Sequence, residues 1–147
     1  MNELYLIAAI SDGGVEMLKP RISPDSAVVC LTNQAKGILD ACQISFVWFS
    51  ELLPYEQDWA SIHLHARNTL FDAHSNVPRR WRAFMISELA TELMYLEAVN
   101  ACLERFCPDA VHFCFERQTE EVPRPFSALL RYLRRAAPVL VQYGEPR

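Results

Sequence analysis

The chain has 147 residues, of which 51% are hydrophobic and 22% are charged, and its formal net charge is −4. This length suits one domain, and the hydrophobic content is high enough to form a core, which excludes a disordered protein. Sequence-independent binding of nucleic acid requires a basic surface, so the negative charge argues against it. We therefore expect a single domain over residues 1–147 that binds no nucleic acid.

The sequence also bears on cellular location. No apolar run approaches the roughly 20 residues of a membrane helix. Glu3 stands where a signal peptide would carry basic residues. The five cysteines are an odd number without a CxxC pair, which fits a reducing compartment and disfavours a structural zinc site. We expect a cytoplasmic protein without a transmembrane segment.

The first half of the chain is predicted to form strands separated by short helices. A continuous apolar run at residues 4–10 is typical of a strand covered on both faces. The cluster Ser11–Gly14 favours a turn, and a brief helical turn at residues 15–18 should be cut short by Pro20 and Pro24. The elements that follow are a strand at residues 27–32, a helix at 34–41 and a third strand at 44–49.

The second half is organised around one long helix at residues 78–106. Its apolar residues recur at steps of three and four, which predicts a single buried face. That face consists of Trp81, Met85, Leu89, Leu93, Leu96, Val99, Leu103 and Phe106. Asn76 is the expected N-cap, and Pro108 should end the helix near Phe106. The remaining elements are a helix at residues 59–70, where residues 62–66 would also fit a strand, a strand at 110–115, a helix around 126–135 and a strand at 139–143.

Alternating apolar strands and helices indicate an α/β fold. We predict a three-layer Rossmann-like sandwich, with five mostly parallel strands and helices on both faces. Right-handed crossovers place the carboxyl ends of all strands along one edge, and open α/β sheets bind ligands there.

Polar residues follow each predicted strand at that edge. They are Ser11, Asp12, Gly13 and Gly14, then Thr32 and Asn33, Ser50 and Glu51, Glu116 and Arg117, and Gly144 and Glu145. A glycine pair lets a backbone approach a phosphate closely, and Arg117 or Arg79 would balance the charge of the phosphate. Glycine pairs are, however, also common in tight turns. A metal held by Asp12, Glu51 and Glu116 is the alternative use of this acidic edge. Neither the GxGxxG fingerprint nor a phosphate loop occurs, so no flavin, nicotinamide or other cofactor is indicated.

Two carboxylates break the pattern of the long helix. Glu88 and Glu92 project one turn apart at the edge of its apolar face. Charged residues usually stay exposed or paired, which favours a rim where they meet arginines. The alternative is a cleft lined by two carboxylates with raised pKa values.

The segment Asp12-Gly13-Gly14-Val15-Glu16 resembles the GGVE loop that follows the first strand in many glycosyltransferases of the GT-B fold. The segment Pro108–His112 is similar to a later strand of that family. The resemblance implies that Gly13 and Gly14 face the phosphates of a donor. The chain departs from the family in two respects, because Pro20 and Pro24 should prevent a full helix after the glycines and the second Rossmann-like half is missing. The resemblance therefore implies an amino-terminal half that does not transfer sugar alone.

Two functions remain open on the sequence alone. In the first, a glycosyltransferase-like domain binds a sugar- or phosphate-bearing ligand, such as a sugar nucleotide or a glycan acceptor. Its expected ligand-binding residues are Asp12, Gly13, Gly14, Glu16, Asn33, Glu116, Arg117 and Glu145. In the second, the chain is a non-enzymatic interaction module or assembly subunit. Trp48, Tyr55 and Trp59 would then anchor a protein partner or a second copy.

Overall fold

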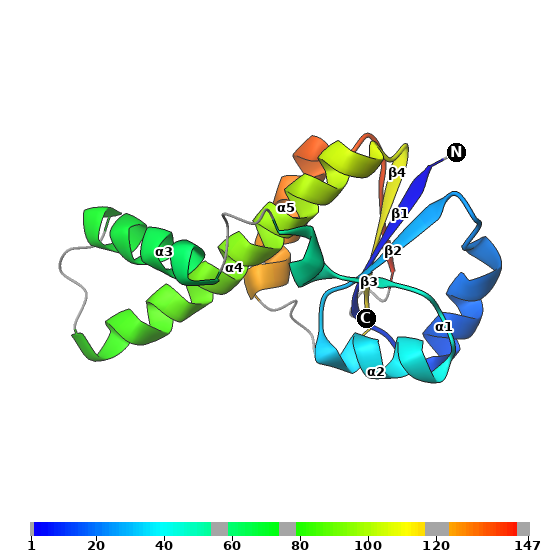
Figure 1. Cartoon of the computed structure of the whole chain (residues 1–147), viewed down its shortest axis with the longest axis horizontal. Coiled ribbons are helices and arrows are strands. Elements are labelled where there is room, and N and C mark those ends of the chain that lie inside the picture. The colour runs from blue at the N-terminus through cyan, green and yellow to red at the C-terminus, as the bar shows by residue number, and fades with distance from the viewer. Residues whose placement is uncertain (1, 54–58, 74–78, 117–123, 144–147) are drawn as a thin grey trace.

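The computed structural model describes residues 2–53, 59–73, 79–116 and 124–143. Five strands form one sheet in the order β3-β2-β1-β4-β5, and every neighbouring pair is parallel. The strands are β1 (Glu3–Ala9), β2 (Ser26–Cys30), β3 (Val47–Trp48), β4 (Ala110–Phe115) and β5 (Leu140–Tyr143). The predicted α/β, Rossmann-like class is confirmed (Figure 1).

The centre of the sheet is the most buried part of the molecule. Leu6 of β1 pairs with Val29 on one side and with Phe113 on the other, and all three side chains are buried. Their runs are apolar without alternation because helices cover both faces of a parallel sheet. The continuous hydrophobic segments were therefore a reliable signal for β1, β2 and β4.

Helices cover the sheet on both sides, in two pairs. The helices are α1 (Asp12–Leu18), α2 (Asn33–Ala41), α3 (Trp59–Ala73), α4 (Arg79–Phe106) and α5 (Arg124–Ala136), with short 3₁₀ turns η1 (Lys19–Arg21) and η2 (Phe49–Leu52). Helix α5 and the carboxyl-terminal part of α4 pack on the face that carries Leu4, Leu6 and Phe113. In contrast, α1 and α2 pack on the face that carries Tyr5 and Ile7.

The third strand is shorter than predicted. Only Val47 and Trp48 are in the sheet, where they pair with the last two residues of β2. The chain then turns through η2, which buries Phe49 and Leu52 in the core beneath α4. The β-forming residues at 44–46 instead supply packing at the edge, because Ile44 and Phe46 rest against the α1–α2 side.

The predicted turn at Ser11–Gly14 is wrong, because these residues begin a helix. Ser11 is the N-cap, and its Oγ accepts a hydrogen bond from the Gly14 amide at 3.1 Å. Pro20 does not end the helical path, since it lies in the first turn of η1, where its fixed φ and missing N–H are tolerated. A continuous helical path therefore runs from Asp12 to Arg21.

The long helix α4 ends where predicted but does not have the predicted single buried face. It stops at Phe106, and Cys107 takes a left-handed conformation (φ 43°) before Pro108. Near the sheet it buries Tyr95, Val99 and Cys102. Farther out it instead buries Ile86 and Ala90 against α3, and Trp81 is 52% exposed.

Length explains why α4 changes partner. Its 28 residues span about 42 Å at 1.5 Å per residue, whereas the seven residues of β1 span about 23 Å. The amino-terminal part of α4 therefore extends past the sheet and pairs with α3 (Figure 1). We call α3 together with residues 79–90 of α4 the arm. In the described ranges, no helix combines the length and apolar content needed to cross a bilayer.

Candidate functional site

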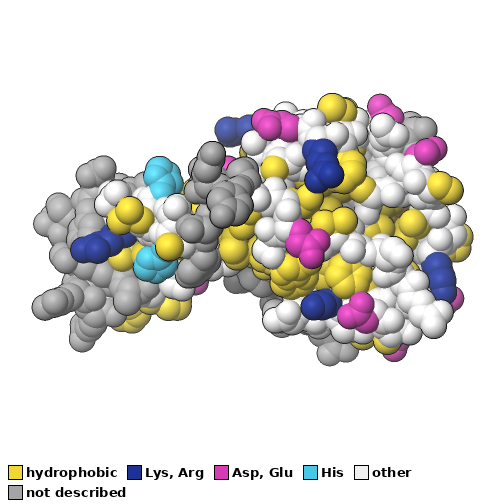
Figure 2. All heavy atoms as spheres, in the orientation of Figure 1, with side chains coloured by type: hydrophobic (Ala, Val, Ile, Leu, Met, Phe, Trp, Pro, Cys, Tyr) yellow, Lys and Arg dark blue, Asp and Glu magenta, His cyan; other side chains and the backbone are white. Residues whose placement is uncertain are grey.

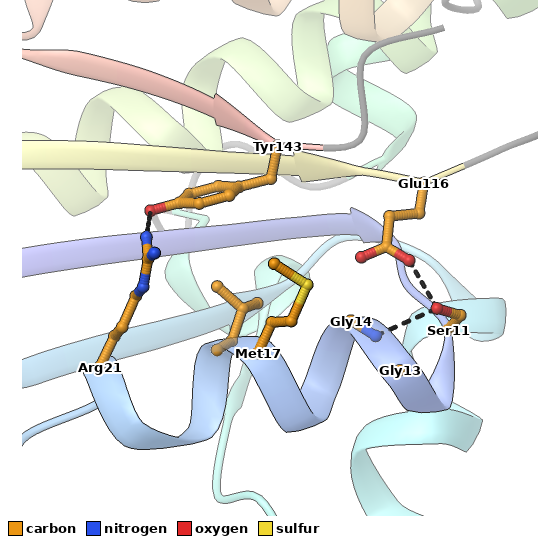
Figure 3. A pocket seen from close by; sticks show the side chains of 8 residues that line it. Ser11, Gly13, Gly14, Met17, Arg21, Glu116 and Tyr143 are labelled. Atoms are coloured by element: carbon orange, nitrogen blue, oxygen red, sulfur yellow. Dashed lines mark hydrogen bonds between the residues drawn. The ribbon is translucent and has the colours of Figure 1, made fainter. Parts of the chain in front are cut away.

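A groove of about 440 Å³ lies beside α1, on the side where α1 faces β4 and β5. Its volume is within the range of about 300–1,000 Å³ typical of small-molecule sites. The lining residues are Ser11, Gly13, Gly14, Met17, Leu18, Arg21, Glu116 and Tyr143. Figure 3 shows Glu116 at one end of the groove, the Arg21–Tyr143 pair at the other, and Met17 between them.

Helical spacing explains why α1 supplies most of this lining. Gly14, Met17, Leu18 and Arg21 follow one another at steps of three, one and three residues along the continuous α1–η1 path. Such steps place side chains on one face of a helix. The face is turned towards Tyr143, to which Arg21 Nη1 donates a hydrogen bond at 2.8 Å.

At the carboxyl edge, Glu116, Ser11 and Gly14 form a compact corner. Ser11 Oγ donates to Glu116 Oε2 at 2.6 Å while accepting from the Gly14 amide. Glu116 is held there because its own amide donates to the Ala9 carbonyl at 2.8 Å, which continues the β1–β4 pairing past the strand end. Within the described ranges, Ser11 Oγ is the one hydrogen-bond partner of this carboxylate, which can accept about four hydrogen bonds.

The two glycines of this corner have different roles. A Cβ at Gly14 would overlap the Glu116 carboxylate, lying 2.6 Å from its carbon. A Cβ at Gly13 would meet nothing closer than Ser11 Oγ, at 3.9 Å. Gly14 is therefore required to make room for Glu116, and Gly13 is not.

This geometry changes the meaning of the glycine pair. The Gly14 amide is already used by Ser11, and the carboxylate of Glu116 lies directly against the first turn of α1. A phosphate in the same place would be repelled by that negative charge. The corner instead suits a ligand that donates hydrogen bonds, such as a hydroxyl group.

At the opposite end of the groove, four side chains form one hydrogen-bonded network: Arg21 from η1, Glu3 from β1, His112 from β4 and Tyr143 from β5. Tyr143 Oη accepts from Arg21 and lies 2.9 Å from His112 Nδ1, and His112 Nε2 lies 3.3 Å from Glu3 Oε1. His112 is buried and is stacked on Tyr5 at a centroid distance of 4.4 Å. One proton arrangement satisfies every group: Tyr143 donates to Nδ1, and the proton on Nε2 faces Glu3. This network fixes the Tyr143 ring and, through it, Arg21.

Two ionisable groups beneath the groove stay protonated at neutral pH. Burial, followed by the neighbouring Glu3 carboxylate, raises the pKa of Tyr5 to about 12. Burial, followed by the charge of Glu116, raises the pKa of the Cys114 thiol to about 12. Because the thiolate is the reactive form of cysteine, Cys114 is a packing residue and not a nucleophile.

The groove brings together three of the eight predicted ligand-binding residues: Gly13, Gly14 and Glu116. The other described candidates lie outside its lining. Asp12 accepts a weak hydrogen bond from Cys42 Sγ at 3.9 Å, and Glu16 and Asn33 are exposed on α1 and α2. Arg117 and Glu145 lie outside the described residues.

The alternative metal site does not form. Asp12, Glu51 and Glu116 are all described, but they are not gathered into one cluster. Across the ranges that the structure describes, no group of three or more His, Cys, Asp or Glu residues could hold a metal ion.

Four lining residues were not predicted from the sequence: Met17, Leu18, Arg21 and Tyr143. The signal for the first three was helical spacing from Gly14, which was hidden because Pro20 suggested an earlier stop. Tyr143 could have been found from strand register. It pairs with Cys114 of β4, two residues before Glu116.

The other residues singled out in the sequence that the structure describes do not line the groove. Glu92 is buried and Glu88 half-buried on α4, and neither carboxylate lines the groove. Trp48 is half-buried, with Phe49 against its ring and Lys36 above it. Tyr55, Asn76 and the side chain of Trp59 lie outside the described part of the chain.

The groove thus combines an apolar middle with a carboxylate at one end and a guanidinium at the other. Such a lining can hold a small polar molecule by its apolar face and orient it through a few hydrogen bonds. Comparison with protein-family models, with curated proteins and with solved structures found no match to this chain.

Proposed function

We propose that this chain is a Rossmann-like, glycosyltransferase-type domain that binds the sugar part of a sugar nucleotide or glycan acceptor in the groove beside α1. The observation that carries this proposal is the Glu116 carboxylate, which accepts the Ser11 hydroxyl at 2.6 Å and retains further acceptor positions. Hydrogen bonds from hydroxyl groups to a carboxylate are short and strong. A second hydroxyl, from a sugar, would bind the same group in the same way.

The rest of the groove supports a sugar as well. Met17, Leu18 and the ring of Tyr143 form an apolar wall next to the carboxylate. A pyranose has an apolar C–H face and a rim of hydroxyl groups, so it matches a lining of this kind. A phosphate at the same end would meet the negative charge of Glu116.

In this proposal the chain binds sugar and does not transfer it alone. Glu116 is the single carboxylate among the described lining residues, and it already accepts a hydrogen bond from the N-cap Ser11. Transfer also needs a donor site, which the resemblance to GT-B enzymes assigns to a second half.

Calorimetric titration with methyl glycosides tests the proposal. Glu116→Gln keeps the size of the side chain but removes its charge, so the affinity should fall about tenfold or more, since a hydrogen bond to a charged group contributes about 1.5–3 kcal/mol. Glu16→Gln is the matched control, because Glu16 is exposed on the same helix outside the groove. Equal affinities in wild type and Glu116→Gln, or no binding of any sugar, would refute the proposal.

A second function is favoured by the surface of the arm. Leu64, Trp81 and Phe84 are 55%, 52% and 58% exposed, and they lie on the two helices that leave the sheet. Figure 2 shows hydrophobic side chains at the surface of the arm beside histidine side chains and a basic side chain, with much of the arm drawn in grey. Exposed aromatic residues are typical anchors of protein interfaces.

Charge suggests a second copy of the chain as the partner. The arm contains four arginines and two acidic residues, Asp72 and Glu88, although the whole chain carries a net charge of −4. The basic arm of one copy could therefore bind the acidic body of another.

Sedimentation velocity at low and high salt tests this second function. Self-association should weaken in high salt and in Phe84→Ser. It should persist in the control Val139→Ser, because Val139 is equally exposed but lies next to β5. A monomer at all concentrations would rule out self-assembly through the arm.

A further inference from the structure

The two ends of the groove carry opposite charge. Glu116 projects over the first turn of α1, and Arg21 approaches the Tyr143 ring at the end of η1 (Figure 3). A ligand that fills the groove must therefore present different chemistry to each end. A neutral sugar has no charged group to match the positive end, so the groove favours a ligand that carries an anion as well as hydroxyl groups.

Arg21 has unused binding capacity. A guanidinium carries five N–H donors, and the described contacts of Arg21 use one of them, on Tyr143 Oη. Arg21 forms no ion pair with any residue in the described ranges, and its side chain is exposed. No described acidic residue neutralises its charge, which leaves the guanidinium available to an anion.

The neighbours of Arg21 hold it in position for such an anion. Its guanidinium carbon lies 5.5 Å from the centroid of the Tyr143 ring, and the Tyr143 hydroxyl is fixed in turn by His112. Glu3 holds the other nitrogen of His112, and the Tyr5 hydroxyl lies between Glu3 Oε2, at 3.2 Å, and the Arg21 carbonyl, at 3.3 Å. A guanidinium already held at one nitrogen loses less freedom when it binds a carboxylate or phosphate bidentately.

We propose that the groove selects an acidic sugar, bound with its hydroxyl groups towards Glu116 and its carboxylate or phosphate on Arg21. This inference rests on the proposed function and adds the class and orientation of the ligand. The reverse orientation would place an anion against the Glu116 carboxylate and is therefore disfavoured. The anion does not bind at the glycine corner where the GT-B resemblance would place it.

Three probes that share one sugar test the inference by calorimetric titration: methyl glucoside, glucuronic acid and glucose 6-phosphate. Both anionic probes should bind about tenfold more tightly than methyl glucoside. Comparison of the two acids distinguishes a carboxylate from a phosphate as the preferred anion. Arg21→Gln should abolish the advantage of the anionic probes over methyl glucoside, with all three probes measured on the same variant.

Arg134→Gln is the matched control, because Arg134 is an exposed arginine on α5, on the opposite side of the sheet. It should bind all three probes like the wild type. The inference fails if the anionic probes bind no better than methyl glucoside, or if their advantage survives in Arg21→Gln. If no probe binds at all, the proposed sugar-binding function fails and this inference fails with it.

Discussion

Gly14 decides what can occupy the first turn of α1. Any side chain there would overlap the Glu116 carboxylate, whereas a Cβ at Gly13, one residue earlier, would meet nothing closer than Ser11 Oγ at 3.9 Å. The sequence indicated that the glycine pair mattered, but it could not show which glycine or why. The reason depends on Glu116, a residue 102 positions farther along the chain that parallel pairing of β1 and β4 brings alongside.

Gly14→Ala should impair sugar binding with little effect on stability. The new methyl group would push the flexible Glu116 side chain away from Ser11, at a cost of about 1 kcal/mol for the lost hydrogen bond. Alanine is favoured over glycine inside a helix by about 1 kcal/mol, so the two effects nearly cancel. Urea denaturation and calorimetric titration of the same variant measure both quantities.

Gly13→Ala is the control for this prediction. It should raise the free energy of unfolding by about 0.4–1 kcal/mol and impair sugar binding less than Gly14→Ala does, because its Cβ would not meet Glu116. A Gly14→Ala variant that binds sugar like the wild type would show that the position of Glu116 is irrelevant to the ligand.

The arm shows what a helical pattern can and cannot predict. Steps of three and four residues correctly located α4 and its end before Pro108, but they implied a single buried face. The helix in fact turns different faces to the sheet and to α3, and Trp81 is exposed although it belongs to the predicted face. Periodicity identifies an amphipathic helix, but it does not show which element the helix packs against. Here α4 packs against the sheet at its carboxyl-terminal end and against α3 where it extends past the strands.

The contact between α3 and α4 relies on small residues. Ala66 and Ala90 are both fully buried there, together with Ile62 and Ile86. Ala90→Leu should force the helices apart at a cost of about 1–3 kcal/mol. Hydrogen exchange should then speed up in α3 while the amides of β1 and β4 stay protected.

Ser87→Leu is the matched control, because Ser87 is exposed on the same helix. It should leave exchange in α3 unchanged. Equal acceleration across the sheet in Ala90→Leu would contradict the view that the arm opens separately from the core.

At the scale of the whole molecule, burial makes the fold sensitive to alkali. Burial raises the pKa of Cys30 from 9.0 to about 11, that of Cys102 and Cys114 from 9.0 to about 12, and that of Tyr95 from 10.0 to about 12. Between about pH 9 and pH 12, each group stays protonated in the folded state, whereas it loses its proton in the unfolded state. The folded state then binds more protons, so its stability must fall as the pH rises.

Urea denaturation across a pH series measures this effect. The stabilisation should be present in full below about pH 9 and should be lost progressively between about pH 9 and pH 12. A free energy of unfolding that stays constant or increases from pH 9 to pH 11 would contradict the burial of these four side chains.

The fold class was predictable because five apolar runs alternate with helices, and this pattern specifies a parallel sheet without any tertiary information. The groove was only partly predictable, since its two ends depend on where α1 stops and on how β5 aligns with β4. Both features are set by packing. Arg21 and Tyr143, which the sequence did not predict, form the end of the groove that these two features position: Arg21 ends the α1–η1 helical path, and Tyr143 lies on β5.

The most direct test of the proposed sugar-binding groove is chemical-shift mapping of the labelled protein with glucose 6-phosphate. The largest amide shifts should fall on residues 11–21, Glu116 and Tyr143, with little change on α2 or the arm. Shifts concentrated on α3 and residues 79–90, or no shifts at millimolar ligand, would contradict the assignment of the groove as the binding site.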